Sequence, residues 1–206
     1  MPDVKLRVAQ IVPCTEAEGP GKRFALWFQG CPFRCPGCCN PEMLQFEGGT
    51  PMSVEEVATQ VARAAEEHNV EGITLIGGEP MAHSDSAAPL ARKVQQLGLT
   101  VMVFSGYTIE GIREGDDPSM QDLLAHTDIL VDGLYDRERP DTTRRWIGSE
   151  NQRIHFLTER YQEDDARWQQ KDTLEIRMVG GEVTINGFPA QRAKGLWKRL
   201  TESPKK

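Results

Sequence analysis

Four of the five cysteines in this 206-residue chain fall within nine residues, and their types and spacing indicate metal chemistry. Cys31, Cys35 and Cys38 are separated by three and then two residues, and Cys39 follows directly. Prolines and a glycine bend this short segment tightly, so three thiolates can converge on one small object. Soft thiolates suit zinc or an iron–sulfur cluster. On spacing alone, the third ligand is either Cys38 or Cys39.

The number of ligands favours an iron–sulfur cluster over zinc. A four-iron cluster has four corners, so three thiolates leave one iron open, and an open position is a chemical handle. A structural zinc site takes four ligands, usually as two close pairs, and no second pair accompanies these cysteines. The histidines are scattered, at His68, His83, His126 and His155. The alternative to a cluster enzyme is a zinc-stabilised interaction module without catalysis. The remaining cysteine, Cys14, is interpreted as a buried thiol and not as a ligand.

The elements that must position this segment alternate between strands and helices. Strands are expected over 4–12, 23–29, 73–76, 100–104 and 129–131, and helices over 53–67, 87–97 and 119–125. Ser53 and Glu56 form a capping box that starts the first helix. This alternation is typical of βα units around a parallel sheet. Near the end, residues 173–178 and 182–186 predict a β-hairpin, and the apolar spacing over 193–200 predicts a short helix.

The net charge and the hydropathy of the sequence indicate which kinds of partner and which location to expect. The net charge of −7 argues against binding to nucleic acid or to an anionic membrane. No apolar run approaches the length of a membrane span, and the first ten residues lack the apolar core of a secretory signal. We therefore expect a cytoplasmic protein with reduced thiols. Arg144 and Arg145 are expected on a solvated face.

Six segments in order resemble the radical S-adenosylmethionine (radical SAM) superfamily, and within it the small activases of anaerobic (class III) ribonucleotide reductases. They are GPGKR over 19–23, QGCPFRCPGCCN over 29–40, ITLIGGEP over 73–80, VFSGY over 103–107, ILVDG over 129–133 and WIGSENQ over 146–152. The resemblance covers about residues 8–157. The residues beyond it leave the identity of the partner open.

This resemblance implies a fold and a division of the chain. The fold is α/β, an incomplete (β/α) barrel of parallel strands, with the cluster loop directly after the first barrel strand. The C-terminal β-hairpin and short helix follow the barrel. Residues 1–157 are expected to form the radical SAM domain with a single 4Fe-4S cluster, and residues 158–206 a C-terminal extension.

The resemblance also implies a reaction. Cys31, Cys35 and Cys38 hold a [4Fe-4S] cluster, and S-adenosylmethionine chelates its open iron. An electron from a flavodoxin or ferredoxin cleaves the sulfonium bond, which yields methionine and a 5′-deoxyadenosyl radical. The radical abstracts hydrogen from a glycine of a partner glycyl radical enzyme, most simply an anaerobic ribonucleotide reductase. The alternatives are a small-molecule enzyme such as a deazaguanine-forming synthase, and an activase for a different protein partner.

Finally, the resemblance assigns contacts with S-adenosylmethionine to residues near the ends of the predicted strands. The backbone of Gly77 and Gly78 and the carboxylate of Glu79 are expected to accept hydrogen bonds from its ammonium group. Strand carboxyl ends carry the active site in barrel-like α/β folds. The remaining expected contacts are Ser105 and Asp132 for the ribose or methionyl moiety, Asn151 and Gln152 for the adenosyl moiety, and Gly37, Cys38 and Cys39 along the nucleoside.

Overall fold

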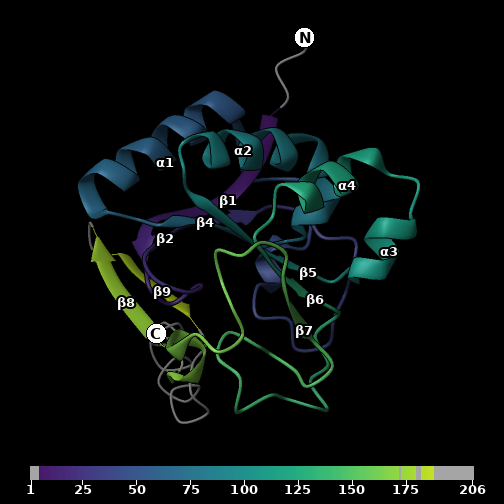
Figure 1. Ribbon diagram of the computed structural model, residues 1–206. Coiled ribbons are helices and arrows are strands. Elements are labelled where there is room, and N and C mark those ends of the chain that lie inside the picture. The colour runs from purple at the N-terminus through teal and green to yellow at the C-terminus, as the bar shows by residue number, and fades with distance from the viewer. Residues whose placement is uncertain (1–4, 172, 180–181, 188–206) are drawn as a thin grey trace, which may run out of the picture.

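A seven-stranded mixed sheet forms the centre of the molecule in the computed structural model, which describes residues 5–171, 173–179 and 182–187 (Figure 1). The strand order is β3-β1-β2-β4-β5-β6-β7, in which β2, β4, β5 and β6 run parallel and the outer pairings are antiparallel. The strands are β1 (Lys5–Thr15), β2 (Arg23–Phe28), β3 (Thr50–Ser53), β4 (Gly72–Gly77), β5 (Thr100–Ser105), β6 (Ile129–Asp132) and β7 (Arg153–Phe156). The α/β class is therefore confirmed, and the incomplete barrel stays a prediction.

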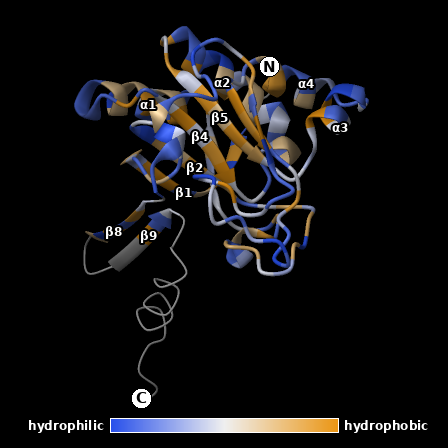
Figure 2. Ribbon diagram, turned by 60° about the horizontal axis from the view of Figure 1, so that its bottom comes forward, coloured by the Kyte–Doolittle hydropathy of each residue, from blue (hydrophilic) through white to orange (hydrophobic). Residues whose placement is uncertain are grey.

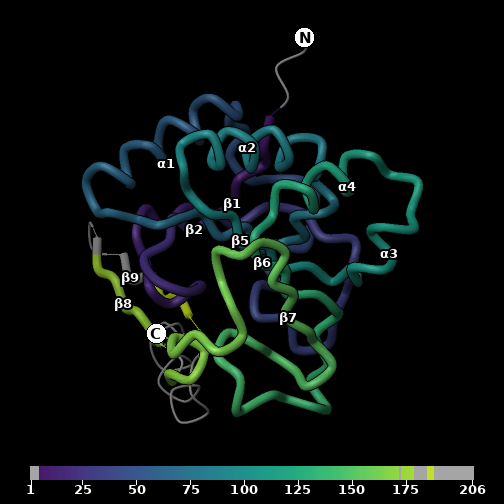
Figure 3. Tube along the Cα trace, in the orientation of Figure 1, coloured from purple at the N-terminus to yellow at the C-terminus, as the bar shows by residue number. Residues whose placement is uncertain are grey.

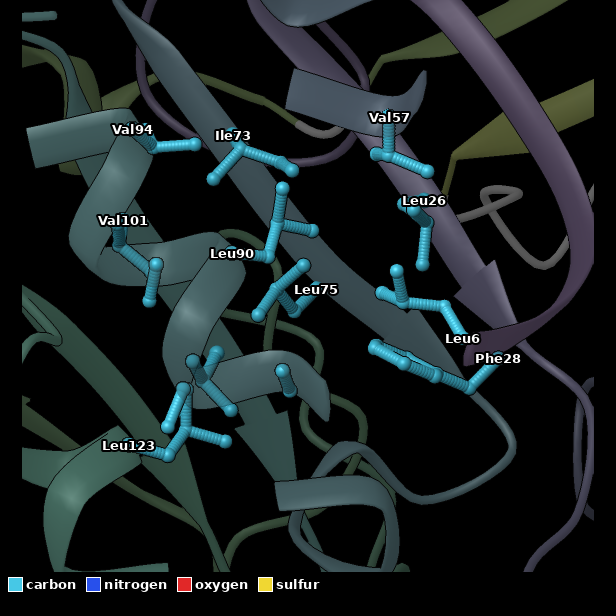
Figure 4. Close-up of a cluster of buried hydrophobic side chains, with 14 of the residues drawn as sticks. Leu6, Leu26, Phe28, Val57, Ile73, Leu75, Leu90, Val94, Val101 and Leu123 are labelled. Carbon is cyan, nitrogen blue, oxygen red and sulfur yellow. The ribbon is translucent and has the colours of Figure 1, made fainter. Parts of the chain in front are cut away.

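The helices lie along one face of this sheet (Figure 2). They are α1 (Val54–His68), α2 (Ser84–Gln96), α3 (Ile109–Glu114) and α4 (Pro118–Ala125), with short 3-10 turns at η1 (Pro41–Met43), η2 (Pro80–His83) and η3 (Ala166–Gln169). The predicted capping box of α1 is present, because Ser53 Oγ accepts from the Glu56 amide at 3.1 Å and Glu56 accepts from the Ser53 amide at 2.6 Å. Side chains of these helices and of the facing strands form the main hydrophobic core (Figure 4).

The opposite face of the sheet is also buried, but loops cover it instead of helices. Along β5, Val101 and Val103 join the main core, whereas Met102 belongs to a second cluster. The long connection over 133–152, named here the β6–β7 loop, and the segment after β7 supply the cover over β5 and β6 (Figure 3). Met43 of η1 packs in a third cluster with residues of β1 and β2. Strands buried on both faces read as continuous apolar runs, which is why their sequences lack clear alternation. Arg145 lies in this cover and is only 7% exposed, so its expected place on a solvated face is wrong.

Three short elements escaped prediction: β3, α3 and β7. They hold four, six and four residues, and windows this short carry little periodicity. The predicted hairpin is present as β8 (Leu174–Val179) and β9 (Glu182–Gly187), paired antiparallel. The predicted helix over 193–200 lies outside the described residues. The division at residue 157 stays a prediction.

Among the described residues, the structure contains no helix with the length and apolar character of a membrane span.

Candidate functional site

The cysteine loop leaves the sheet at the carboxyl end of β2, and two backbone hydrogen bonds hold its first residues. The Gly30 amide donates to the Met43 carbonyl at 2.9 Å, and the Cys31 amide donates to the Leu44 carbonyl at 3.1 Å. Gly30 has φ +109, and a Cβ at this position would lie 2.5 Å from the Phe46 ring. The loop therefore begins in a conformation and a space that favour glycine.

A tight turn brings the second and third cysteines together. The Cys38 amide donates to the Cys35 carbonyl at 3.1 Å, and Gly37 between them has φ +78. Proline followed by a glycine with positive φ is the signature of a type II turn, and Pro36-Gly37 supplies it. Gly37 is thus required by the backbone, whatever it contributes to a bound nucleoside.

The cysteine thiols differ in exposure but share one environment. Cys31 is buried, Cys35 and Cys38 are half-buried, Cys39 is exposed, and none of the five forms a disulfide. Burial, together with smaller effects of Glu79, Cys38 and Cys35, raises the pKa of the Cys31 thiol to about 11. Burial also raises the pKa of Cys35, with Cys38 adding to the shift. The three thiols come from one short loop that the Cys35–Cys38 turn closes, so that a metal centre, which deprotonates its thiol ligands, could be shared among them.

The described residues contain no group of three or more His, Cys, Asp or Glu side chains arranged around a single metal ion. A mononuclear zinc site needs its sulfur ligands within about 2.3 Å of one point. In a four-iron cluster each cysteine binds a different iron, so its ligands surround a larger object. Three soft thiolates on one short loop are the donor type that such a cluster takes.

Gly77 and Gly78 let the end of β4 approach the cysteine loop. A Cβ on Gly78 would lie 2.3 Å from the Gly30 carbonyl oxygen, and Gly77 has φ +87. The Gly78 amide donates to the Phe28 carbonyl at 2.8 Å, and the next amide, that of Glu79, donates to the Gly30 carbonyl at 2.9 Å. Backbone packing therefore accounts for both glycines, and their expected contact with a ligand stays a prediction.

The carboxylate of Glu79 joins the ends of β4 and β5. It is 2% exposed and accepts from the Met81 amide at 2.9 Å, Ser105 Oγ at 2.8 Å and the Gly106 amide at 2.7 Å. Burial raises the pKa of Glu79 to about 7, against the opposing effect of those three donors. Ser105 Oγ in turn accepts from the Tyr107 amide at 3.0 Å. Glu79 and Ser105, which were predicted separately as ligand contacts, thus form a hydrogen bond with each other.

An aromatic contact that was not predicted seats the cysteine loop on the end of β5. The rings of Phe33 and Tyr107 meet edge to face at 4.8 Å, and a Cβ on Gly106 would lie 2.7 Å from the Phe33 ring. The signal available in the sequence was an aromatic residue inside the cysteine spacing. Its partner lies 74 positions away along the printed chain, which no local pattern reveals.

Asp132, at the end of β6, is engaged within the protein. It is fully buried, accepts from Arg153 Nε at 3.0 Å and from the Ile109 amide at 2.7 Å, and lies 3.1 Å from His155 Nε2. Burial alone would raise the pKa of Asp132, but the bonds from Arg153, Ile109 and His155 outweigh it and lower the pKa. The carboxylate thus ties β6 to β7 and α3, and its predicted contact with the ribose or methionyl moiety stays a prediction.

Asn151 and Gln152 close the β6–β7 loop, and they differ in how fully they are bonded. Gln152 Oε1 accepts from the Gly148 amide at 3.0 Å, and its Nε2 donates to the Gly133 carbonyl at 3.0 Å. Asn151 Nδ2 donates to the Leu134 carbonyl at 2.7 Å, but its buried Oδ1 has no hydrogen-bond partner within the described structure. A buried acceptor without a donor is costly, so Asn151 Oδ1 is the atom here that a bound ligand could satisfy.

Asn151 also lines a hollow beside the cysteine loop. Its volume is about 540 Å³, and its walls are Pro36, Leu134, Tyr135, Asp136, Arg137, Glu138 and Asn151. Pro36 comes from the cysteine loop and the other lining residues from the β6–β7 loop. The site therefore combines three thiols, the linked ends of β4 and β5, and a hollow lined in part by Asn151, all near the carboxyl ends of the parallel strands.

Comparison with known proteins bears on this site. The model of a family described as "4Fe-4S single cluster domain" matches residues 17–155. Among curated proteins, the anaerobic ribonucleoside-triphosphate reductase-activating protein of Vibrio cholerae serotype O1 is 30% identical over 156 residues, which are 72% of this chain and 97% of that protein. The protein of the same name from Pasteurella multocida is 28% identical over 160 residues, 75% of this chain and 99% of its own.

The Escherichia coli K12 protein of that name is 28% identical over 155 residues, covering 72% of this chain and 97% of the relative. Among solved structures, QueE from Escherichia coli aligns with 50% of this chain and 54% of its own, at 17% identity and a TM-score of 0.41. No conclusion about fold or function follows from a structural similarity of that size.

Proposed function

Because this chain belongs to the 4Fe-4S single cluster domain family and to the family of anaerobic ribonucleoside-triphosphate reductase-activating proteins, we propose that it generates a glycyl radical on an anaerobic ribonucleotide reductase. In this proposal it is a radical SAM enzyme that cleaves S-adenosylmethionine reductively and abstracts hydrogen from a glycine of its partner. The parallel strands then form the incomplete barrel of that superfamily, within a domain over residues 1–157. Residues 158–206 are its C-terminal extension.

The observation that carries the proposal is the cysteine loop at the carboxyl end of β2. Cys31, Cys35 and Cys38 are the cluster ligands in this reading, and Cys39 is not. The type II turn holds Cys38 next to Cys35, and the charge of Cys38 raises the pKa of both Cys31 and Cys35. Three thiolates on one short loop leave the fourth iron for a substrate ligand.

The residues around this loop suit S-adenosylmethionine. When bound, a reduced cluster supplies the electron that cleaves the sulfonium bond of S-adenosylmethionine. Gly78 and Glu79 present acceptors to the ammonium group, and a cation there favours the charged form of the Glu79 carboxylate. Asn151 Oδ1, which lacks a donor within the described residues, accepts from the adenine amino group.

The surrounding protein keeps these groups in place. Ser105 fixes the Glu79 carboxylate, and Gln152 holds the β6–β7 loop beside the end of β6. Gly37 and Cys39 line the nucleoside, and Asp132 contributes through the Arg153 bond that anchors the start of β7. A flavodoxin or ferredoxin supplies the electron, and the reducing cytoplasm suits the thiol ligands.

Anaerobic reconstitution tests the proposal. The protein is expected to bind about four irons per chain. With S-adenosylmethionine, dithionite and an anaerobic ribonucleotide reductase, electron paramagnetic resonance should show a glycine-centred doublet on the reductase. Release of 5′-deoxyadenosine without that doublet would favour a small-molecule substrate or a different protein partner. A single zinc per chain with no cluster would overturn the proposal in favour of the interaction module.

A further inference from the structure

The segment after β7 runs from the sheet to the β6–β7 loop. We name residues 158–171, together with Thr173, the brace. The brace is anchored to the sheet, because the Tyr161 hydroxyl accepts from Arg23 at 3.0 Å and lies 2.9 Å from Thr100 Oγ1. Arg167 of the brace also pairs with Glu71 at 3.0 Å. Both contacts lie near the amino ends of the parallel strands, away from the cysteine loop.

Next to Arg167, the brace contacts the β6–β7 loop through aromatic rings. Trp168 is 9% exposed and meets Trp146 edge to face, with 5.1 Å between ring centroids. Trp168 also meets Phe156 of β7 at 5.2 Å, and its indole nitrogen donates to the Gln162 carbonyl at 2.9 Å. The indole of Trp168 is thus fixed on several sides.

Arg145 makes the polar half of the same junction. Its guanidinium donates to the Arg167 carbonyl at 3.2 Å, to Gln170 Oε1 at 2.9 Å and to Thr173 Oγ1 at 2.9 Å. The same group lies 4.1 Å from the Trp146 ring centroid. Because a guanidinium group donates along fixed directions, these three hydrogen bonds constrain both the distance and the orientation of the β6–β7 loop relative to the brace.

Backbone strain marks the same place. Trp146 has φ +62, in the left-handed region that a bulky side chain rarely adopts. Such a conformation persists where the surroundings over-determine it. Here the surroundings that the structure describes include Trp168 of the brace and Arg145.

Hydrogen bonds and an ion pair within the β6–β7 loop connect this junction to the site. Arg144 pairs with Asp141 at 2.6 Å and donates to the Gln152 carbonyl at 2.8 Å, next to Asn151. The Asp136 amide donates to Ser149 Oγ at 3.0 Å, which joins the two sides of the loop. Beyond these bonds lie Tyr135 and Asn151, which line the hollow beside the cysteine loop.

We propose that the brace is a positioning element for the site, which holds the β6–β7 loop against the cysteine loop through the Trp168–Trp146 and Arg145 contacts. The family match ends at residue 155, so the brace lies wholly beyond it. The consequence for S-adenosylmethionine binding rests on the proposed function. The consequence for the β6–β7 loop does not, because it concerns the polypeptide alone.

Hydrogen exchange tests the structural part on the full-length, anaerobically reconstituted protein. Trp168→Ala should speed amide exchange over residues 133–152 by about fivefold or more, while β4 stays unchanged. Trp168→Phe, which keeps a ring against Trp146, should restore most of the protection. Arg160→Ala is the matched control, because Arg160 lies in the brace but bonds to the Gly98 carbonyl instead of the β6–β7 loop. Equal exchange in Trp168→Ala and Arg160→Ala would overturn the proposal.

Kinetics test the functional part. For cleavage of S-adenosylmethionine, Trp168→Ala should raise KM by about tenfold or more, with a smaller change in kcat and unchanged iron content. Arg160→Ala should match the wild type. An unchanged KM beside faster exchange would overturn the positioning role. If Trp168→Ala does not fold, Gln170→Ala and Thr173→Val replace it, because each removes one hydrogen-bond partner of Arg145. The same changes in hydrogen exchange and in KM are then expected. If the wild-type protein leaves S-adenosylmethionine intact, that result would count against the proposed function. Hydrogen exchange would still test whether the brace holds the β6–β7 loop.

Discussion

At the scale of single residues, two adjacent thiols have different surroundings. The Cys38 amide closes the turn onto Cys35, and the Cys38 thiol is half-buried beside the other two ligand candidates. Cys39 is exposed and acts on Tyr135 of the β6–β7 loop, where it raises the pKa of that phenol after the larger effect of burial. The structure thus separates two cysteines that spacing alone left equivalent.

We predict that Cys38→Ala abolishes the cluster and Cys39→Ala does not. Iron should fall from about four per chain to near zero in the first variant, because one cluster corner loses its protein ligand. Iron analysis and the visible absorption of anaerobically reconstituted protein measure this. Loss of iron from Cys39→Ala alone would show that the third ligand is misassigned.

A second prediction concerns Glu18, a carboxyl buried where β9 meets the sheet. It is 4% exposed and accepts from the Gly187 amide at 2.6 Å, and burial raises its pKa from 4.5 to about 8. A raised carboxyl pKa means that the folded state holds a proton which the unfolded state has released. The Glu18 contribution to stability is therefore fully present below pH 4.5 and is lost as the pH rises to about 8.

Urea denaturation across this pH range measures the effect. Each unit of pKa shift corresponds to about 1.4 kcal/mol, so the unfolding free energy of the cluster-free protein should fall by a few kcal/mol. Glu18→Gln should flatten that dependence, whereas Glu16→Gln, at an exposed neighbouring position, should leave it intact. A slope that persists in Glu18→Gln would assign the dependence to another group.

At the scale of elements, the site depends on how closely β4 and the cysteine loop approach. The Gly30 carbonyl accepts from the Glu79 amide at 2.9 Å, and no side chain fits between the two segments at Gly78. Glu79 then carries the connection onward to the end of β5. The cysteine loop is thus held by strand ends that lie about fifty and about seventy-five residues further along the sequence.

We predict that Gly78→Ala destabilises the protein by about 1–3 kcal/mol, the usual cost of overpacking, and loosens cluster binding. The new methyl group would lie 2.3 Å from the Gly30 carbonyl oxygen, so backbone must move. Gly111→Ala is the control, because Gly111 lies in α3, where its nearest contact would be the Thr108 side chain at 3.2 Å. The free energies of unfolding of the two variants should differ clearly, and equal values would refute the close approach.

At the scale of the whole molecule, two of the three hydrophobic clusters among the described residues lie on opposite faces of the sheet around β5. The helices cover the larger core, while the β6–β7 loop and the brace cover the smaller one, which includes Met102, Ile129, Trp146, Tyr161 and Trp168. Two aromatic residues of the smaller core come from beyond residue 157. The extension therefore helps to bury a face of the sheet.

We predict that a chain ending at Leu157 unfolds at a temperature lower by about 10 °C or more than the full chain. Loss of a single buried aromatic side chain costs about 3 kcal/mol, and 1 kcal/mol shifts the melting temperature of a protein of this size by about 2–4 °C. Thermal denaturation followed by circular dichroism measures the difference. An unchanged melting temperature would show that the extension is an independent appendage.

Local patterns predicted most elements and the candidate cluster cysteines, although spacing alone left Cys38 and Cys39 equivalent as the third ligand. The capping box at Ser53, the alternation of strands and helices, and the cysteine spacing each depend on residues close together in the chain. Such signals are legible because their interactions form within one turn, one strand or one loop. The resemblance to a known family rested on the same short segments, and the family match is consistent with it.

Tertiary structure alone decided which of these residues meet. Glu79 bonds to Ser105, Asp132 to Arg153, and Phe33 packs against Tyr107. Arg145 is buried because the brace returns across the sheet to meet it, and a charged residue in a loop gives no local sign of that. Contacts between distant residues follow from strand order and from what covers each face, and neither is encoded in the periodicity of a short window.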